Sequence, residues 1–589
     1  MKLSGRPARA RLRTARLRAL PPVHPSGSSD ATSPNESTAR PSQKPRALSL
    51  AAAERGMLPD LLHAQPAISL DERSLQHALS FAFVAGSAGG AMRSALSHSA
   101  LAASSFTPDT LQDGLFLHEL VSIGFAFSSS GRPAPIDHGL LRRLFTQPPS
   151  DRTHAEFRQA ILCELAKAPA LAKGIERAYS AIVELPKLLD DEGTDARLDM
   201  TNWRLDVLRA LRDAIAALDQ TFAAATSGLS RLHAFGARVQ RSAGYERLCA
   251  LLDYEGDSAR AQLQVRLGAD GRIRGLDILT LREREDSPFH VSPLRRLWRQ
   301  LTAWLQGYRI GPSEVVDRWL EEVFEGVREH IPTLLQLKGD LEFYLGALHF
   351  KALAEAKGLS VCLPEIAPDD DAGEKTLHGL WNPLLLSEPK PPVPTDVALP
   401  RFACTCITTG PNSGGKTRFL QALALSQLLG QAGAFVPAKQ ARIRPVGGMF
   451  VSLGEAPHAH QKEGRLGMEL VRIRTLFEQA TAGSFVVLDE LCSGTNPSEG
   501  EEIFRMLLEL LHELDHEVHI TTHFLNFAQT LEAESAALGL CFLQVELDRA
   551  QHPTYRFIPG VATTSLAQQT AERLGVTRDQ LRGMIRRES

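Results

Sequence analysis

Apolar residues recur at helical spacing through the first half of the chain, from about Ser69 to Leu359. The clearest stripes are Leu208, Leu211, Ile215, Leu218 and Phe222, and then Val316, Leu320, Val323, Val327 and Ile331. Because residues three and four apart share one face of a helix, each stripe predicts an amphipathic helix. We therefore expect a mostly α-helical region, residues 51–365, whose stripes form its core.

A different pattern interrupts these helices near residues 262–279. The alternating apolar residues are Leu263, Val265 and Leu267, and after Asp270-Gly271 they are Ile273 and Ile278. Alternation on both sides of a turn dipeptide predicts a β-hairpin set between helices. Its polar positions include Arg266, Arg272 and Arg274, which could contact a nucleic-acid backbone or could simply face solvent.

In the second half of the chain, short apolar strands alternate with helical stretches. The strands are Ala403–Thr409, Met449–Leu453, Phe485–Leu488, Val518–Thr522 and Leu540–Leu547. Such alternation predicts an α/β domain with a mostly parallel sheet, here residues 377–560. The acidic, proline-containing stretch Pro364–Glu374 is predicted to be the linker that precedes this domain.

Residues 1–50 are rich in Arg, Pro and Ser, and no acidic residue precedes Asp30. A segment of this composition buries too little apolar surface to offset its ordering entropy, so we predict a disordered arm. The arm could bind DNA, could be a transit peptide, or could be an inert tail.

Composition adds constraints but does not select a ligand. The net charge is -3, from 65 basic and 68 acidic residues, so a nucleic-acid surface would have to be a local patch. Seven cysteines are typical of a reducing compartment, and the Cys404/Cys406 pair lies in an apolar run that favours core packing over a metal site. No apolar stretch reaches the roughly 18 residues of a membrane span. We expect a soluble, cytoplasmic protein of two or three domains.

The strongest chemical signal is a match to G-x-x-x-x-G-K-[ST] between an apolar strand and a helical run. It consists of Gly410, Pro411, Asn412, Ser413, Gly414, Gly415, Lys416 and Thr417. Glycines let backbone N–H groups face phosphate oxygens, and the helix N-terminus adds its positive end. Lys416 is predicted to reach the β- and γ-phosphates, and Thr417 to bind Mg²⁺.

Two further strands end in polar side chains. Asp489 and Glu490 follow Ser484–Leu488, and His523 follows Val518–Thr522. Alone, each would be an ordinary strand end, but beside a P-loop Asp489 can hold Mg²⁺ and Glu490 can deprotonate the attacking water. For His523 we predict a role as a γ-phosphate sensor.

These motifs together resemble the MutS family of mismatch-repair ATPases. The loop at 410–417 resembles the GPNMGGKS loop of that family, and Leu488–Thr495 and Thr522–Phe524 are similar to its DE-x-x-x-GT and TH[YF] segments. Weaker similarities lie at Trp381–Leu384, at Val393–Asp396 beside the adenine, in the core helix Leu341–Ile366 and in the tail Gly560–Ile585.

The resemblance implies an ABC-like P-loop ATPase domain preceded by a helical core and lever, with a dimerisation tail at 561–589. It also implies a homodimer that binds mismatched or branched DNA, closes on binding ATP and is reset by Mg²⁺-dependent hydrolysis. Mismatch repair or a related form of DNA maintenance would be its process.

Several positions depart from the family pattern. No hydroxyl residue occurs in Gly464–Glu469, where the family places its trans-acting Ser-Thr pair, and Arg418 replaces a small hydroxyl residue. None of the 25 phenylalanines begins the Phe-x-Glu wedge that stacks on a mispaired base. The chain before the helical region is also short for the two usual N-terminal domains. We therefore expect a divergent member without the mismatch-recognition domain, which recognises DNA shape.

Two other hypotheses stay open. An SMC-like or transporter-type ABC ATPase shares the P-loop, but no LSGGQ stretch precedes Asp489. An ATP-gated regulator that binds RNA or ribosomes would share the same ATPase signature, and the net charge does not distinguish DNA from RNA.

Overall fold

The computed structural model describes residues 58–564, 576–578 and 581–582, apart from 108–110, 112–113, 130, 192–199, 257–258, 268–272, 284–311, 454–464, 482, 493–495 and 515. All of these residues belong to one unit, Ala51–Ser589. The predicted arm at 1–50 and most of the predicted tail at 561–589 lie outside them.

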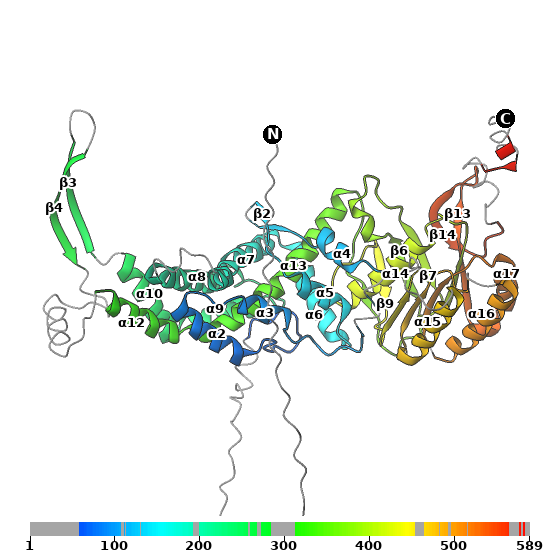
Figure 1. Cartoon of the computed structure of the whole chain (residues 1–589), viewed down its shortest axis with the longest axis horizontal. Helices are drawn as coiled ribbons and strands as arrows, with labels where there is room; N and C mark the ends of the chain where they lie inside the picture. Colours follow the sequence, from blue (N-terminus) through cyan, green and yellow to red (C-terminus); the bar gives the residue numbers. More distant parts are fainter. Residues whose placement is uncertain are drawn as a thin grey trace, which may run out of the picture. The chain divides into compact units, whose positions relative to one another are not determined.

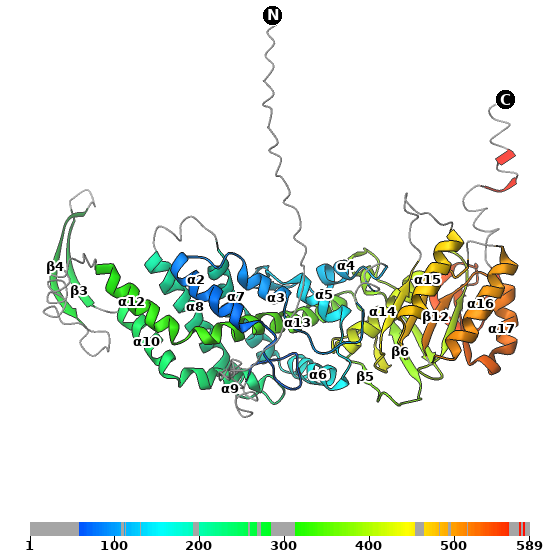
Figure 2. The same cartoon turned by 60° about the horizontal axis from the view of Figure 1, so that its bottom comes forward.

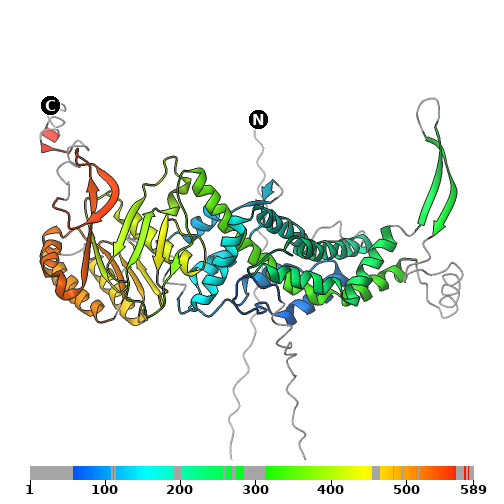
Figure 3. The same ribbon diagram turned by 180° about the vertical axis from the view of Figure 1, so that it is seen from behind.

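Helices dominate the described chain up to Ala356, as the apolar periodicity predicts. They are α2 (Glu72–Ala85), α3 (Ala91–Ser97), α4 (Leu117–Gly124), α5 (His138–Thr146), α6 (Arg152–Lys167), α7 (Pro169–Asp190), α8 (Met200–Thr221), α9 (Ser230–Gln240), α10 (Ala243–Gly256), α12 (Pro312–Glu325), the 3₁₀ turn η2 (Arg328–His330) and α13 (Ile331–Ala356). A two-residue pair, β1 (Ser128–Ser129) and β2 (Arg132–Pro133), separates α4 from α5. Figures 1 and 3 show, from opposite sides, α7 running along both α8 and α13.

The predicted apolar stripes form the core of these helices. All five residues of the first stripe, Leu208 to Phe222, are fully buried. The second stripe is also buried from Leu320 onward, but it crosses a break: α12 ends at Glu325, and Ile331 begins α13. Gly326 lies at this break, where its backbone approaches the backbone of Gly244 on α10. Periodicity therefore predicted which residues are buried but not the end of the helix.

The predicted hairpin is present and longer than expected. Strands β3 (Ala259–Leu267) and β4 (Ile273–Glu283) pair antiparallel, between α10 and α12 in the chain. Figure 1 shows the hairpin extending away from α10 and α12. Its turn at 268–272 and the side chains of Arg266 and Arg274 lie outside what the structure describes.

The second half of the chain contains the predicted α/β sheet. Its six strands are arranged in the order β10 (Met449–Ser452), β11 (Phe485–Leu488), β12 (Glu517–Thr521), β8 (Thr405–Thr409), β13 (Leu540–Leu547) and β14 (Pro553–Pro559). The first five are parallel and β14 is antiparallel, so the prediction of a mostly parallel sheet is confirmed. Its helices, visible in Figure 2, are α14 (Lys416–Gln431), α15 (Arg465–Gln479), α16 (Pro497–His512) and α17 (Leu525–Leu538).

A second sheet, absent from the prediction, is formed by strands that precede the P-loop in the chain and one strand that follows it. Its order is β5 (Glu365–Ile366), β9 (Gln440–Ile443), β6 (Lys375–Leu380) and β7 (Thr395–Leu399), and the short turn η3 (Pro383–Ser387) joins β6 to β7. The stretch Pro364–Glu374, interpreted as a linker, therefore contains a strand. Arg442 of β9 holds it by ion pairs to Glu365 and Asp371, which the acidic composition alone did not reveal.

One continuous apolar core joins the helical region to the α/β region; for example, Leu218, Phe343 and Leu423 belong to the same cluster. The seven cysteines are all free thiols. Among the described helices, none combines the length and the apolar character needed to cross a bilayer.

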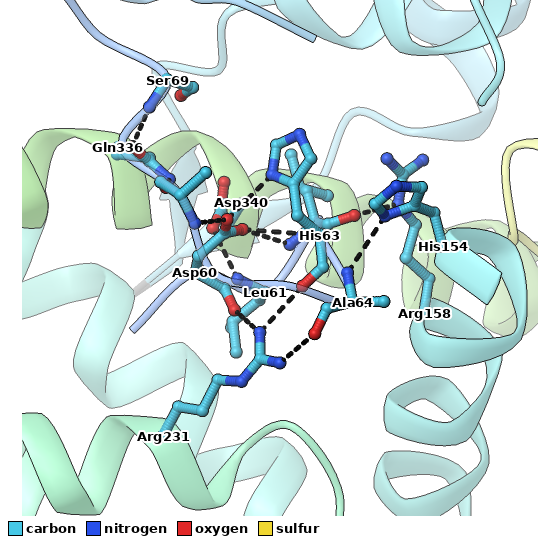
Figure 4. A network of polar contacts seen from close by, with 12 residues as sticks. Asp60, Leu61, His63, Ala64, Ser69, His154, Arg158, Arg231, Gln336 and Asp340 are labelled. Carbon is cyan, nitrogen blue, oxygen red and sulfur yellow. Dashed lines mark hydrogen bonds and ion pairs between the residues drawn. The ribbon is translucent and has the colours of Figure 1, made fainter. Parts of the chain in front are cut away.

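Buried polar contacts fasten residues 58–69, here called the strap, to three helices (Figure 4). Asp340 of α13 accepts a hydrogen bond from the Leu61 N–H at 2.9 Å, and Gln336 accepts one from Ser69 N–H at 2.8 Å. Arg231 of α9 donates to the strap carbonyls of Asp60, His63 and Ala64. Burial, together with the neighbouring Asp60 charge, raises the pKa of Asp340 well above its usual range.

Arg158 of α6 connects the strap to the P-loop helix α14. Its Nε donates to the Leu62 carbonyl at 2.9 Å, and its Nη1 donates to the Ala432 carbonyl, at the C-terminal end of α14, at 2.8 Å. The C-terminal end of helix α14 is thus attached to the helical region.

Candidate functional site

The P-loop follows β8 directly and has the backbone conformation that its sequence requires. Gly410 and Gly415 have φ values of 143° and 89°, in the left-handed region that a side chain disfavours. Gly414 is needed for space, because a Cβ there would lie 2.9 Å from the Pro411 carbonyl oxygen. The loop then enters α14 at Lys416, so the N-terminus of a helix faces the enclosed space.

Lys416 is held inside this loop. Its Nζ donates to the carbonyls of Gly410 and Pro411 at 3.0 and 3.2 Å, and the side chain is 5% exposed. Burial lowers the pKa of the Lys416 ammonium, and the carboxylates of Glu490 and Asp489 oppose that shift. The predicted phosphate-binding lysine therefore lies close enough to the predicted acidic pair for their charges to interact.

The acidic pair meets the P-loop at Thr417. Thr417 Oγ1 donates to Asp489 Oδ2 at 2.6 Å, although 72 positions separate the two residues. Asp489 follows β11, and its N–H donates to the Ser452 carbonyl at the end of β10. The two predicted Mg²⁺ ligands, a hydroxyl and a carboxylate, are thus adjacent.

A cavity of about 570 Å³ opens beside the loop, which is within the range of small-molecule sites. The loop and the acidic pair contribute Asn412, Ser413, Gly415, Lys416, Thr417 and Glu490 to its lining. Much of the remaining lining is apolar, among it Trp381, Leu385, Pro391, Pro392, Val393 and Phe557, with the charged residues Glu388 and Lys390 beside them. Polar and cationic groups together with apolar groups are what the phosphates and the base of a nucleoside triphosphate require.

Both upstream motifs reach this cavity. Asn382 lines it and donates from Nδ2 to the Arg418 carbonyl in the first turn of α14, at 2.8 Å. Val393 and Thr395 line it from the other motif, and Thr395 Oγ1 accepts a hydrogen bond from the Phe557 N–H at 2.8 Å. The second sheet and η3 carry these residues to the loop.

Three of the site residues that sequence reasoning missed lie on the central sheet. Tyr555 and Phe557 of β14 line the cavity, and Phe557 stacks on Phe419 with ring centroids 4.0 Å apart. Thr521, the last residue of β12, contacts Asp489 and Glu490. No motif marks these positions, because an alternating strand and a strand-end threonine are common in any sheet.

His523 occupies a different place. It follows β12 by two positions, is exposed, and lies against the ring of Phe524, with centroids 4.5 Å apart. It is not among the residues that line the cavity. Its role as a γ-phosphate sensor stays a prediction. The stretch 464–469, where the family places its trans-acting pair, is described only in part, and residues 493–495 lie outside the described residues.

Comparison with known proteins relates the region around the P-loop to a known family. Residues 406–581 match the family model described as MutS domain V. This part of the chain is similar to domain V of the MutS family. The prediction of a MutS-type P-loop domain is therefore confirmed, and the P-loop, the acidic pair and β14 all fall inside the MutS domain V match.

Curated relatives carry the same similarity beyond MutS domain V. The chain is 30% identical to an endonuclease MutS2 of Thermomicrobium roseum over 306 residues, which are 50% of this chain and 36% of that protein. It is 29% identical to endonuclease MutS2 of Thermus thermophilus over 421 residues, 70% of this chain and 51% of that protein. A putative endonuclease MutS2 of Bacillus subtilis is 30% identical over 278 residues. The matches span about a third to a half of these relatives.

Proposed function

We propose that this protein is an ATP-dependent DNA-binding protein of the MutS type, which hydrolyses ATP in the cytoplasm during mismatch repair or a related form of DNA maintenance. The observation that carries the proposal is the 2.6 Å contact between Thr417 of the P-loop and Asp489, with Lys416 and Glu490 facing the same cavity. A loop that binds triphosphate and an acidic pair that can cleave it share one site.

Each residue has a chemical task in the proposed reaction. The backbone N–H groups at 412–417 and the N-terminus of α14 bind the phosphates, and Lys416 leaves its loop carbonyls for the β- and γ-phosphates. Glu490 accepts the proton of the attacking water, and the apolar side of the cavity takes the base. Tyr555, which is 52% exposed at the cavity edge, offers a ring against the base.

The donor set at Thr417 and Asp489 fits Mg²⁺, because hard cations prefer hydroxyl and carboxylate oxygens. A bound Mg²⁺ would supply positive charge that offsets the negative charge of the phosphates. Thr417 and Asp489 would hold it, while Glu490 stays free for water.

Two substitutions test the ATPase. Lys416→Ala should abolish nucleotide binding, and Glu490→Gln should retain binding while turnover falls by about 100-fold or more. Lys187→Ala, at a lysine 67% exposed on α7, is the matched control and should behave as the parent. If Glu490→Gln hydrolyses ATP at the parental rate, the assigned base is wrong.

Ligand class is tested by DNA-stimulated ATPase and by electrophoretic binding to homoduplex, mismatched and four-way junction DNA, with structured RNA as competitor. Without a Phe-x-Glu wedge, we expect the junction to bind best and the single mismatch no better than homoduplex. Preference for the mismatch would overturn recognition by shape. Displacement by RNA but not by duplex DNA would favour the RNA-binding regulator.

The proposed assembly is a homodimer. Leu470 and Val471 of α15 and Met506 and Leu510 of α16 are apolar and between 40% and 50% exposed. A second copy covering these faces would remove them from water. Light scattering of the purified chain, with and without ATP, should give twice the chain mass of 64.3 kDa. A monomer under both conditions would contradict this part of the proposal.

A further inference from the structure

Three neighbouring strands of the central sheet end at the proposed site, in the order β11, β12, β8. Strand β11 leads to Asp489 and Glu490, and β8 leads to the P-loop. The middle strand, β12, ends at Thr521, which is fully buried. Sheet order therefore places the Thr521 side chain between the acidic pair and the phosphate-binding loop.

The Thr521 hydroxyl makes two hydrogen bonds there. It donates to Asp489 Oδ1, and it accepts a hydrogen bond from the Glu490 N–H at 2.8 Å. Since a hydroxyl has one proton to donate, the acceptance from Glu490 and the donation to Asp489 assign both directions. Asp489 Oδ2 accepts a hydrogen bond from the Thr417 hydroxyl, so threonines from two elements orient the two carboxylate oxygens.

Glu490 needs such support because its backbone is strained. Its φ is 51°, in the left-handed region, which costs a non-glycine residue free energy. Strained backbone at a functional site persists only where surrounding contacts hold it. The bond from the Glu490 N–H to Thr521 is one such contact, and it sets the direction in which the Glu490 side chain leaves the chain.

We propose that Thr521 is a positioning residue for ATP hydrolysis, which holds the Asp489 carboxylate toward Thr417 and the Glu490 carboxylate toward the cavity. The inference rests on the proposed ATPase function. Thr521 is not among the residues that line the cavity, so it acts on turnover through the acidic pair and leaves nucleotide binding to the P-loop.

The test is Thr521→Val, which keeps the shape and strand preference of threonine and removes the hydroxyl. The matched control is Thr408→Val. Thr408 is the cross-strand neighbour of Thr521 on β8 and is equally buried, and among the described residues its hydroxyl has no hydrogen-bond partner. Both substitutions change the same atoms in the same layer of the sheet, so a general packing effect would appear in both.

We expect the turnover number of Thr521→Val, measured per molecule of bound nucleotide at saturating ATP, to fall by about 10- to 100-fold. The dissociation constant for ATP should stay within about 3-fold of the parent, and the Mg²⁺ concentration for half-maximal turnover should rise. Normalising to bound nucleotide removes any unfolded fraction from the result. Thr408→Val should match the parent in all three quantities.

Thr521→Ser is the rescue variant, because it restores the hydroxyl and lacks only the methyl group. It should recover most of the parental turnover. Parental turnover in Thr521→Val, or equal losses in Thr521→Val, Thr521→Ser and Thr408→Val, would overturn the positioning role while leaving the ATPase intact. Failure of the proposed function looks different, because the parent itself would then neither bind nor hydrolyse ATP.

Discussion

Replacing Arg158 with methionine tests how strongly the helical region stabilises the C-terminal end of the P-loop helix α14. Arg158 lies on α6, is 1% exposed and donates to two carbonyls, those of Leu62 in the strap and Ala432 at the C-terminal end of α14. Methionine retains most of the aliphatic length, so the perturbation removes the guanidinium without opening a large cavity.

The magnitude follows from opposing effects. Hydrogen bonds from a charged donor contribute about 1.5–3 kcal/mol each, and a cation at a helix C-terminus adds about 0.3–2 kcal/mol. Against this, methionine relieves the cost of a buried charge, a cost reflected in the pKa of Arg158, which burial lowers. We expect Arg158→Met to lower the free energy of unfolding by about 2–4 kcal/mol.

Urea unfolding, followed by far-UV circular dichroism, measures this loss. Arg209→Met is the control, because Arg209 on α8 is 40% exposed and forms an ion pair with the exposed Asp206; it should cost less than about 0.5 kcal/mol. An Arg158→Met midpoint equal to the parent's would refute the claim that this guanidinium fastens α14 to the strap.

Three further predictions concern other buried or partly buried residues. Lys375→Met should cost about 3–5 kcal/mol of stability in urea unfolding, because it leaves the buried Glu517 carboxylate without the ammonium now 2.5 Å away. His154 accepts the Ala64 N–H at Nδ1, and burial lowers its pKa from 6.5, so stability should be complete above pH 6.5 and fall as the pH drops below it. His154→Asn, which keeps an acceptor, should flatten that loss. Gly433→Ala should cost about 2 kcal/mol or more, since its φ is 83° and a Cβ would lie 2.8 Å from a backbone carbonyl oxygen on α6.

Each of these has its own control. Lys351→Met removes the lysine from an ion pair in which the carboxylate, Glu355, is exposed, and a loss as large as that of Lys375→Met would contradict the role of burial. An unchanged pH profile in His154→Asn would exclude this histidine as the titrating group. Gly358→Ala, with φ of 73° and no atom within 4 Å of the added Cβ, measures the cost of the left-handed backbone conformation alone. If it costs as much as Gly433→Ala, the close contact with α6 contributes nothing.

Local sequence predicted a large part of this protein. The glycines and Lys416 of the P-loop, the strand that ends at Asp489 and the buried stripe of α8 are all visible in windows of a few residues. Such features depend on backbone preferences and on side-chain periodicity along one element, which are encoded by neighbours in the chain.

Tertiary structure alone decided how these elements meet. Thr521 reaches Asp489 across 32 positions, and Arg158 reaches Ala432 across 274. The contributions of the strap, the second sheet and the aromatic residues of β14 became visible only through such long-range contacts. The residue types at these positions are common in such local sequences. Their roles depend on the order of the strands and on which partner is buried within hydrogen-bonding distance. No local sequence pattern specifies either of these.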